Sequence, residues 1–145
     1  MKIPKKPPSL VGKLLSNLTG LKVDLSPEDI DDKMIFMCFF DMQQRPSRYC
    51  LRQLSKRVQE LKAKDIVVVA VQASKLNENT LNKWVKKYNI PFTVGMVQGD
   101  EEKTRFSRGV RSVPWLILTD REHIVHAEGF ALNELTEKLE QVNEQ

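Results

Sequence analysis

The stretch that decides the fold is FMCFFDMQQRPSRYCLRQLSKR, residues 36–57. It starts within an apolar run over residues 33–40, the pattern of a strand buried on both faces. The run ends at Asp41, and a polar loop then leads into a basic segment with leucines at helical spacing. Ser47 opens this predicted helix and Cys50 lies in its first turn. A thiol at a helix N-terminus is a typical layout for thiol chemistry.

The distribution of charge argues against a nucleic-acid-binding protein. The chain has 145 residues, the length of one domain, with 23 basic and 19 acidic side chains. Four of the lysines lie in residues 1–13, which hold no acid, so the remainder carries 19 charges of each sign. Nucleic-acid binding requires a positive patch on the folded body, and we therefore expect no nucleic-acid partner.

The N-terminal residues have the composition of a linker. Residues 1–10 are rich in proline and lysine, and residues 11–145 are expected to form one domain. A tail of this composition fits a module of a larger protein. Prolines stand where a secretory signal needs an apolar stretch, and no apolar run approaches the ~18 residues that span a bilayer. The sequence thus predicts a soluble chain without a signal peptide. Its two cysteines are too few to indicate a compartment.

The order of predicted elements indicates a three-layer α/β fold. Apolar runs predict strands over residues 33–40, 65–73, 91–97, 113–120 and 123–130. Amphipathic patterns with capping signals predict helices that begin near residues 25, 47, 77, 100 and 133. Alternating buried strands and helices require crossovers, and therefore a mainly parallel central sheet flanked by helices. The last two strands form an antiparallel hairpin, which makes the sheet mixed, and a C-terminal helix closes the domain.

Six segments in this order resemble the thioredoxin fold, and within it the TlpA-like redoxins, which are related to the AhpC/TSA proteins. The segments are VGK, MCFFD, PSRYCLRQL, WVKKYNIPFTV, GVRSVPWLILTD and IVHAEGF, and the resemblance extends from about residue 11 to residue 139. It implies thiol–disulfide or peroxide chemistry with a protein or peptide thiol or disulfide as the partner. It implies no cofactor, and no spacing of histidine and cysteine indicates a metal site.

The resemblance also implies a defect in the active site. In the register that aligns the helices, Ser47 replaces the exposed nucleophilic cysteine, Cys50 matches the second, more buried one, and Pro46 replaces a tryptophan. A dithiol reductase attacks with the first thiolate and resolves the mixed disulfide with the second. A serine hydroxyl cannot take the first role. The domain is therefore expected to be monothiol or catalytically silent.

Several neighbours are expected to support this site. The helix N-terminus lowers the pKa of a thiolate, and Arg45, Arg48 and Arg52 lie around Cys50 in the sequence. These arginines equally fit a solvated helix end, or an anionic group of a partner. Asp41 fits a structural role as an acceptor for loop N–H groups.

Pro114 matches the family's cis-proline, which packs against the thiol loop and shapes a groove. The resemblance implies a cis bond at Val113-Pro114, although only ~5–6% of X–Pro bonds in folded proteins are cis. Val113, Pro114 and Trp115 are then the residues expected to line a groove for an extended partner segment.

A peroxiredoxin-like peroxidase is the alternative function. Peroxiredoxins carry a Thr/Ser-x-x-Cys motif, in which Ser47 would bind peroxide and Cys50 would become a sulfenic acid. Gln43 stands where that motif begins with proline, and Arg111 is only near the position of the peroxide-binding arginine. Cys38 lies within an apolar strand, where a free cysteine acts as a small hydrophobe. Whether Cys50 is reactive or inert stays open at this stage.

Overall fold

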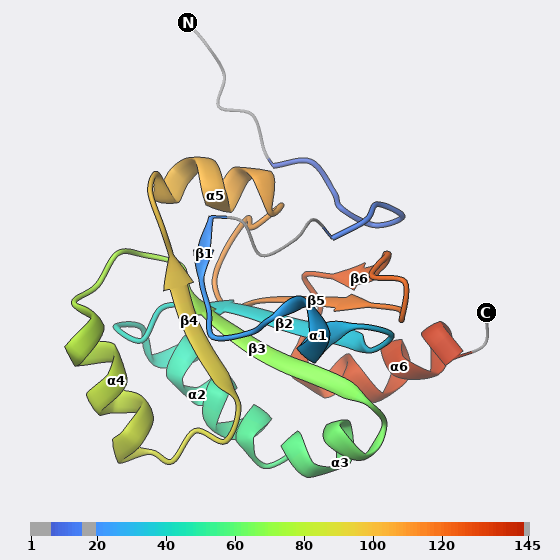
Figure 1. Cartoon of the computed structure of the whole chain (residues 1–145), viewed down its shortest axis with the longest axis horizontal. Coiled ribbons are helices and arrows are strands. Elements are labelled where there is room, and N and C mark those ends of the chain that lie inside the picture. The colour runs from blue at the N-terminus through green and yellow to red at the C-terminus, as the bar shows by residue number, and fades with distance from the viewer. Residues whose placement is uncertain (1–6, 16–19, 144–145) are drawn as a thin grey trace, which may run out of the picture.

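A six-stranded mixed sheet forms the centre of the protein, in the order β1-β4-β3-β2-β5-β6. The computed structural model describes residues 7–15 and 20–143 (Figure 1). The central strands β2, β3 and β4 are parallel, and β1, β5 and β6 pair antiparallel with their neighbours. The strands are β1 (Leu21–Lys22), β2 (Met34–Phe40), β3 (Ile66–Gln72), β4 (Thr93–Val97), β5 (Trp115–Thr119) and β6 (Val125–Glu128).

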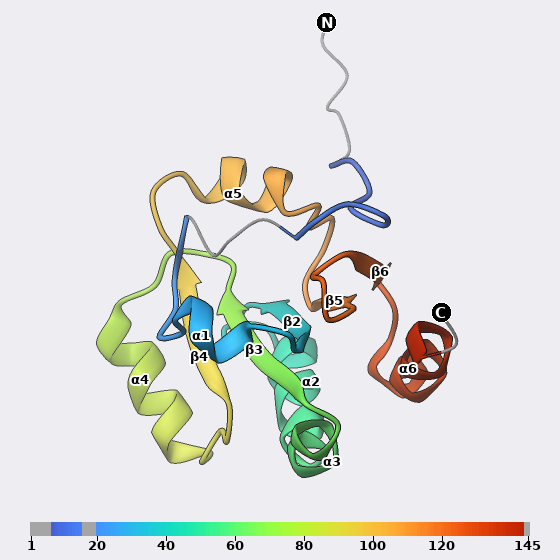
Figure 2. The same cartoon turned by 45° about the vertical axis from the view of Figure 1, so that its right-hand side comes forward.

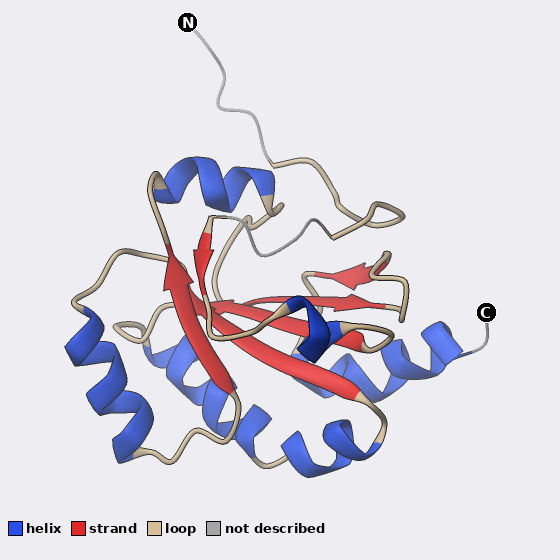
Figure 3. Cartoon of the chain, in the orientation of Figure 1, coloured by secondary structure: helices blue, strands red, loops and turns tan. Residues whose placement is uncertain are grey.

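Helices cover both faces of this sheet, which confirms the predicted three-layer architecture (Figure 3). Helices α2, α3, α4 and α6 lie on one face, and α1 and α5 lie on the other (Figures 1 and 2). The helices are α1 (Pro27–Ile30), α2 (Arg45–Ser55), α3 (Val58–Ala63), α4 (Glu78–Lys87), α5 (Glu101–Ser107) and α6 (Leu135–Asn143), with a 3₁₀ turn over Leu132–Glu134 before α6.

Strand β2 is buried on both faces, as its continuous apolar run predicts. Alternate residues of a strand point to opposite faces. Phe36, Cys38 and Phe40 join the core that packs against α2, α4 and α6. Met37 and Phe39 join the second core, on the side of α1. Cys38 therefore points toward the helix that carries Cys50.

The helix after β2 begins earlier than predicted, at Arg45 rather than at residue 47. Gln44 is its N-cap residue, with extended backbone angles. Pro46 is tolerated within the first turn because the backbone N–H it lacks has no intrahelical partner there.

The described part of the N-terminal segment, residues 7–15, contacts the rest of the domain. The Ser9 hydroxyl and the Leu10 N–H both donate to the carboxylate of Glu128. The Gly12 N–H donates to the Val125 carbonyl at 2.8 Å, so this segment extends the edge of β6. Ser9 and Leu10 of the predicted linker are therefore in contact with the domain, and residues 1–6 lie outside the described residues. In the described part of the chain, no helix is both long and apolar enough to cross a bilayer.

Candidate functional site

The exposure of the residues at the start of α2 differs from the prediction. Ser47 is the third residue of the helix and is fully buried, whereas the N-cap residue Gln44 is exposed. The Ser47 hydroxyl oxygen accepts a hydrogen bond from the Asp41 N–H at 3.1 Å. The prediction that Ser47 occupies an exposed, attacking position is therefore wrong. Its side chain holds the preceding loop.

Side chains form hydrogen bonds with the backbone of that loop, residues 41–44. The Asp41 carboxylate accepts hydrogen bonds from the Gln43 N–H at 3.0 Å and from the Gln72 amide at 3.2 Å. The Gln72 amide oxygen accepts from the Met42 N–H at 2.9 Å, and Arg48 donates to the Met42 carbonyl at 2.9 Å. Asp41 thus has the structural role that its position permits. The sequence analysis missed Gln72, although it is the lone polar residue at the end of a buried strand.

Cys50 is the sixth residue of α2 and lies in its second turn, not the first. The N–H groups of the helix start therefore do not reach its thiol. The three arginines also lie elsewhere. Arg45 is exposed, Arg48 is bound to the loop, and the Arg52 guanidinium lies 5.2 Å from the centre of the Tyr88 ring. The three arginines therefore do not contact the Cys50 thiol, and the exposure of Arg45 fits the solvated helix end that was one of the expectations.

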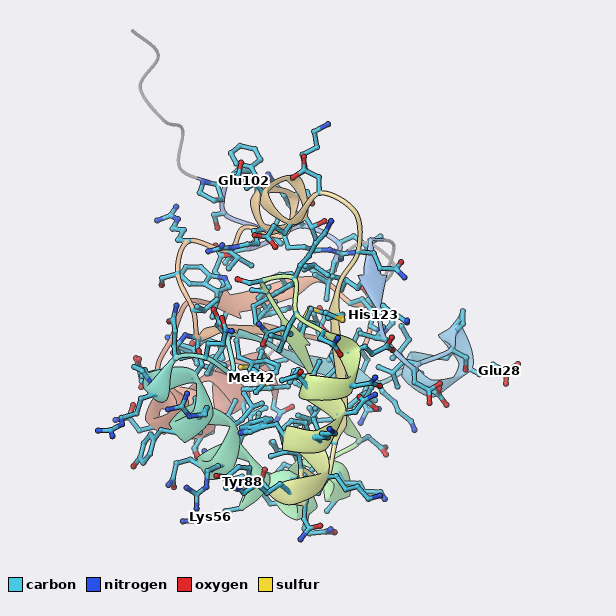
Figure 4. All side chains as sticks on the ribbon, turned by 90° about the vertical axis from the view of Figure 1, so that its left-hand side faces the viewer. Glu28, Met42, Lys56, Tyr88, Glu102 and His123 are labelled. Carbon is cyan, nitrogen blue, oxygen red and sulfur yellow. The ribbon has the colours of Figure 1, made fainter. Side chains whose placement is uncertain are left out.

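A cavity of about 720 Å³ lies beside Cys50. The face of α2 forms one wall, and β5 with the segment after β6 forms the other, through Tyr49, Cys50, Gln53, Pro114, Leu116 and Phe130. Lys56 and Arg57 line the cavity at the end of α2. Figure 4 shows how far this end lies from the loop, with Lys56 and Met42 at opposite ends of the helix. Neither Arg45, Arg48 nor Arg52 belongs to the lining. Within the described ranges, no cluster of three or more potential metal ligands occurs.

The Val113-Pro114 peptide bond is cis, as predicted. Pro114 lines the cavity, but Trp115 does not. Trp115 packs on the other face of the sheet, over Gly129, where a Cβ atom would come within 2.6 Å of the indole ring. Side chains alternate along a strand, so Pro114 and Trp115 cannot share a face. Val113 also packs toward the second core. The prediction that the Val113 and Trp115 side chains line the groove is therefore wrong.

Two thiols meet beneath the cavity. Cys38 is fully buried on β2, Cys50 is 8% exposed on α2, and both are free. The hydrogen bond from the Cys38 thiol lowers the pKa of Cys50, although burial opposes this shift. The same bond and complete burial hold the pKa of Cys38 well above its usual value. Cys38 was expected to be a structural residue of its strand, and its place beside Cys50 was not predicted, because residues 38 and 50 lie on different elements.

Solved structures with a similar fold include two thiol–disulfide proteins and a peroxiredoxin. The thioredoxin domain of a thiol-disulfide oxidoreductase from Bacteroides vulgatus has a TM-score of 0.73 and 18% identity, covering 90% of this chain and 96% of that one. A thiol-disulfide isomerase from Corynebacterium glutamicum gives 0.72 and 17%, covering 92% and 97%. The reduced 2-Cys peroxiredoxin of Plasmodium vivax gives 0.69 and 15%, covering 94% and 83%.

Sequence comparison identifies the family. No match occurs among curated protein sequences. The sequence profile of the AhpC/TSA family, however, matches residues 8–128, most of the chain. These residues include the β2 strand, the loop, α2 and the cis-proline. The chain therefore belongs to the AhpC/TSA family and has the thioredoxin-like fold of the thiol–disulfide oxidoreductases.

Proposed function

We propose that this domain binds an extended segment of a partner protein or peptide in the cavity beside Pro114, without reducing it through a Cys-x-x-Cys centre. The observation that carries the proposal is the cavity itself. Its volume of about 720 Å³ lies within the usual range for ligand sites, and apolar side chains from α2, β5 and the segment after β6 line it.

The absence of standard chemistry follows from two positions at the start of α2. The resemblance implies an exposed cysteine there and a more buried one three residues later. Gln44 and Ser47 fit these positions by exposure and by spacing. Neither side chain carries a sulfur atom, so neither the attacking nor the resolving step of a dithiol reductase is available at this place.

The backbone beside the cis-proline supports binding of an extended chain. Within residues 7–15 and 20–143, the Val113 N–H and C=O form no backbone hydrogen bond. An extended segment supplies such bonds through its own main chain, as in β-strand addition. We therefore expect Val113 to contact the segment through its backbone and not through its side chain.

The charge of the cavity favours an acidic segment. Lys56 and Arg57 are the charged residues of its lining, and the lining contains no acidic side chain among the described residues. Arg57 already contacts Glu60 and Thr136, which leaves Lys56 as the more available cation. Complementary charge favours encounter and orientation of a partner.

Titration with short peptides tests this proposal. The probe is a capped peptide of alternating leucine and glutamate, and the control peptide replaces glutamate with lysine. We expect the acidic peptide to shift the amide resonances of Val113, Tyr49 and Phe130, and Tyr49→Ala to weaken binding severalfold. Tyr88→Ala is the matched control, because Tyr88 is an exposed tyrosine at the C-cap of α4 and lies outside the lining. Equal shifts with both peptides, or none at the cavity, contradict the proposal.

The peroxidase alternative has less support from the geometry. It requires the Ser47 hydroxyl and Cys50 to face the same peroxide. The hydroxyl accepts from the Asp41 N–H instead, and neither Ser47 nor Arg111 belongs to the cavity lining. Trapping of a sulfenic acid with dimedone after peroxide treatment separates the two functions. Rapid trapping at Cys50 that Ser47→Ala abolishes would favour the peroxidase.

A further inference from the structure

The proposed segment binding uses no thiol chemistry, yet the two cysteines at the cavity are arranged as a dithiol. Cys38 faces Leu116 across the β2–β5 ladder, and both side chains belong to the core that α2 covers. Leu116 and Cys50 in turn line the cavity together. The interaction between the two sulfurs is the largest cause of the pKa shift of each thiol, and the Cys38 thiol also lies 3.8 Å from the Phe39 carbonyl oxygen. One sulfur is therefore at the wall of the cavity, and the other is directly behind it.

We propose that Cys50 and Cys38 form a redox-active dithiol that a low-molecular-weight disulfide, bound in the cavity, oxidises to an internal disulfide between α2 and β2. This pair differs from a Cys-x-x-Cys centre in its place and in its elements. Its two sulfurs come from a strand and from the second turn of a helix, whereas Gln44 and Ser47 occupy the helix start. The inference does not depend on the proposed partner segment.

The reaction balances with the disulfide as the oxidant. The Cys50 thiolate attacks one sulfur of the disulfide R–S–S–R, which forms a mixed disulfide and releases one RS⁻. That leaving group takes up the proton that Cys50 lost. Cys38 then loses its proton and attacks the Cys50 sulfur, which releases the second RS⁻ to be protonated. The protein loses two hydrogens, and the small disulfide becomes two thiols.

Burial fixes the order of the two attacks. Cys38 is fully buried and is not in the cavity lining, so an external disulfide cannot reach its sulfur. Cys50 is at the wall, and the hydrogen bond from Cys38 lowers its pKa and raises its thiolate fraction. Limited exposure of Cys50 also restricts the oxidant to a molecule that enters the cavity. A disulfide of two short peptides is small enough to enter the cavity of about 720 Å³.

Oxidised glutathione is the probe for the first experiment. The native protein is incubated with it, quenched with acid, alkylated and weighed by mass spectrometry. We expect the parent to become two hydrogens lighter and resistant to alkylation, with Cys38 and Cys50 linked in the peptide map. The rate should rise with the glutathione concentration. A parent that keeps two free thiols, or that stops at a stable glutathione adduct, overturns the proposal.

Two variants separate the steps. Cys38→Ala removes the resolving sulfur and should stop at a glutathione adduct on Cys50, with complete loss of the internal disulfide. Cys50→Ser should give no adduct, because Cys38 is inaccessible. Adduct formation on Cys38 at the parent's rate contradicts the assigned order.

The parent provides its own control for folding. If the disulfide formed only through unfolding, its rate would be independent of glutathione and equal to the unfolding rate, and that result also overturns the proposal. Cys38→Ala, which leaves the cavity lining unchanged, should bind the acidic peptide as the parent does. Failure of peptide binding in both proteins would count against the proposed function and not against the dithiol.

Discussion

The loop from Asp41 to Ser47 and the thiol pair below the cavity are neighbours with opposite chemistry. The loop is the place where the resemblance implies sulfur, and here it holds a network of oxygen and nitrogen atoms that bond to one another. The sulfur atoms lie deeper, on β2 and in the second turn of α2. The loop makes these hydrogen bonds within the protein on a thioredoxin-like scaffold that also has the helix and the cis-proline.

The two regions differ in how much stability a substitution is expected to remove. A buried hydrogen-bonded group that loses its partner costs about 1–3 kcal/mol, so the loop tolerates little substitution. A buried thiol behaves as a small hydrophobe, so the two cysteines pack in the core even when they take part in no reaction. The following predictions test this division.

The largest effect is expected from restoring sulfur to the loop. The double variant Gln44→Cys/Ser47→Cys places one thiol at the exposed helix start and a second at the buried third position. We expect reduction of insulin disulfides to rise from the background to an easily measured rate. Ser47→Cys alone should stay at the background, because its sulfur is buried without an exposed partner. Equal activity of the single and double variants would show that our assignment of the two positions is wrong.

A large loss of stability is expected when the network loses Gln72. Gln72→Leu leaves the Met42 N–H without its partner inside the protein and removes one of the two hydrogen bonds that the Asp41 Oδ1 oxygen accepts. We expect the free energy of unfolding, measured in urea, to fall by about 3 kcal/mol. The exposed Gln98→Leu serves as the control and should change it by less than about 0.5 kcal/mol. A Gln72 variant as stable as the parent would mean that water replaces these bonds at no cost.

A smaller loss is expected for Ser47→Ala. The Asp41 N–H then lacks an acceptor at a fully buried position, which should lower the free energy of unfolding by about 1–2 kcal/mol. Ser55→Ala, in the same helix, is the matched control. Its hydroxyl donates only to the Leu51 carbonyl of the preceding turn, at a partly buried position, so we expect a smaller change. If both variants lost the same free energy of unfolding in urea, the Ser47 hydroxyl would stabilise the protein no more than that of Ser55.

The smallest effect concerns the pH dependence of Cys50. Its pKa is lowered by the hydrogen bond from Cys38. Because only the thiolate is alkylated, the rate of reaction with iodoacetamide rises with pH, with its midpoint below that of an ordinary thiol. Cys38→Ala removes the donor, so the midpoint should move to higher pH and the rate at neutral pH should fall. A midpoint that stays in place would show that Cys38 does not act on Cys50.

Local patterns were enough to predict most of the architecture. The apolar run of β2 identified a strand buried on both faces, and Asp100 was correctly taken as the start of α5. The cis bond before Pro114 followed from resemblance. Predictions of this kind succeed because a buried strand requires apolar residues along its length and a helix start requires a capping residue at one position. Both requirements concern residues that are neighbours in the sequence. The short strand β1 went unpredicted, since two residues carry no period.

The sequence by itself determined the fold, its family resemblance and the lack of a Cys-x-x-Cys motif, since these depend on residue types and their order. Only the tertiary structure decided which side chains meet. It buried Ser47 beneath Asp41, turned Trp115 away from Pro114 and brought Cys38 to Cys50. The physical reason is rotational: one residue of shift along a strand reverses a side chain, and a two-residue shift in a helix start changes the face that it presents.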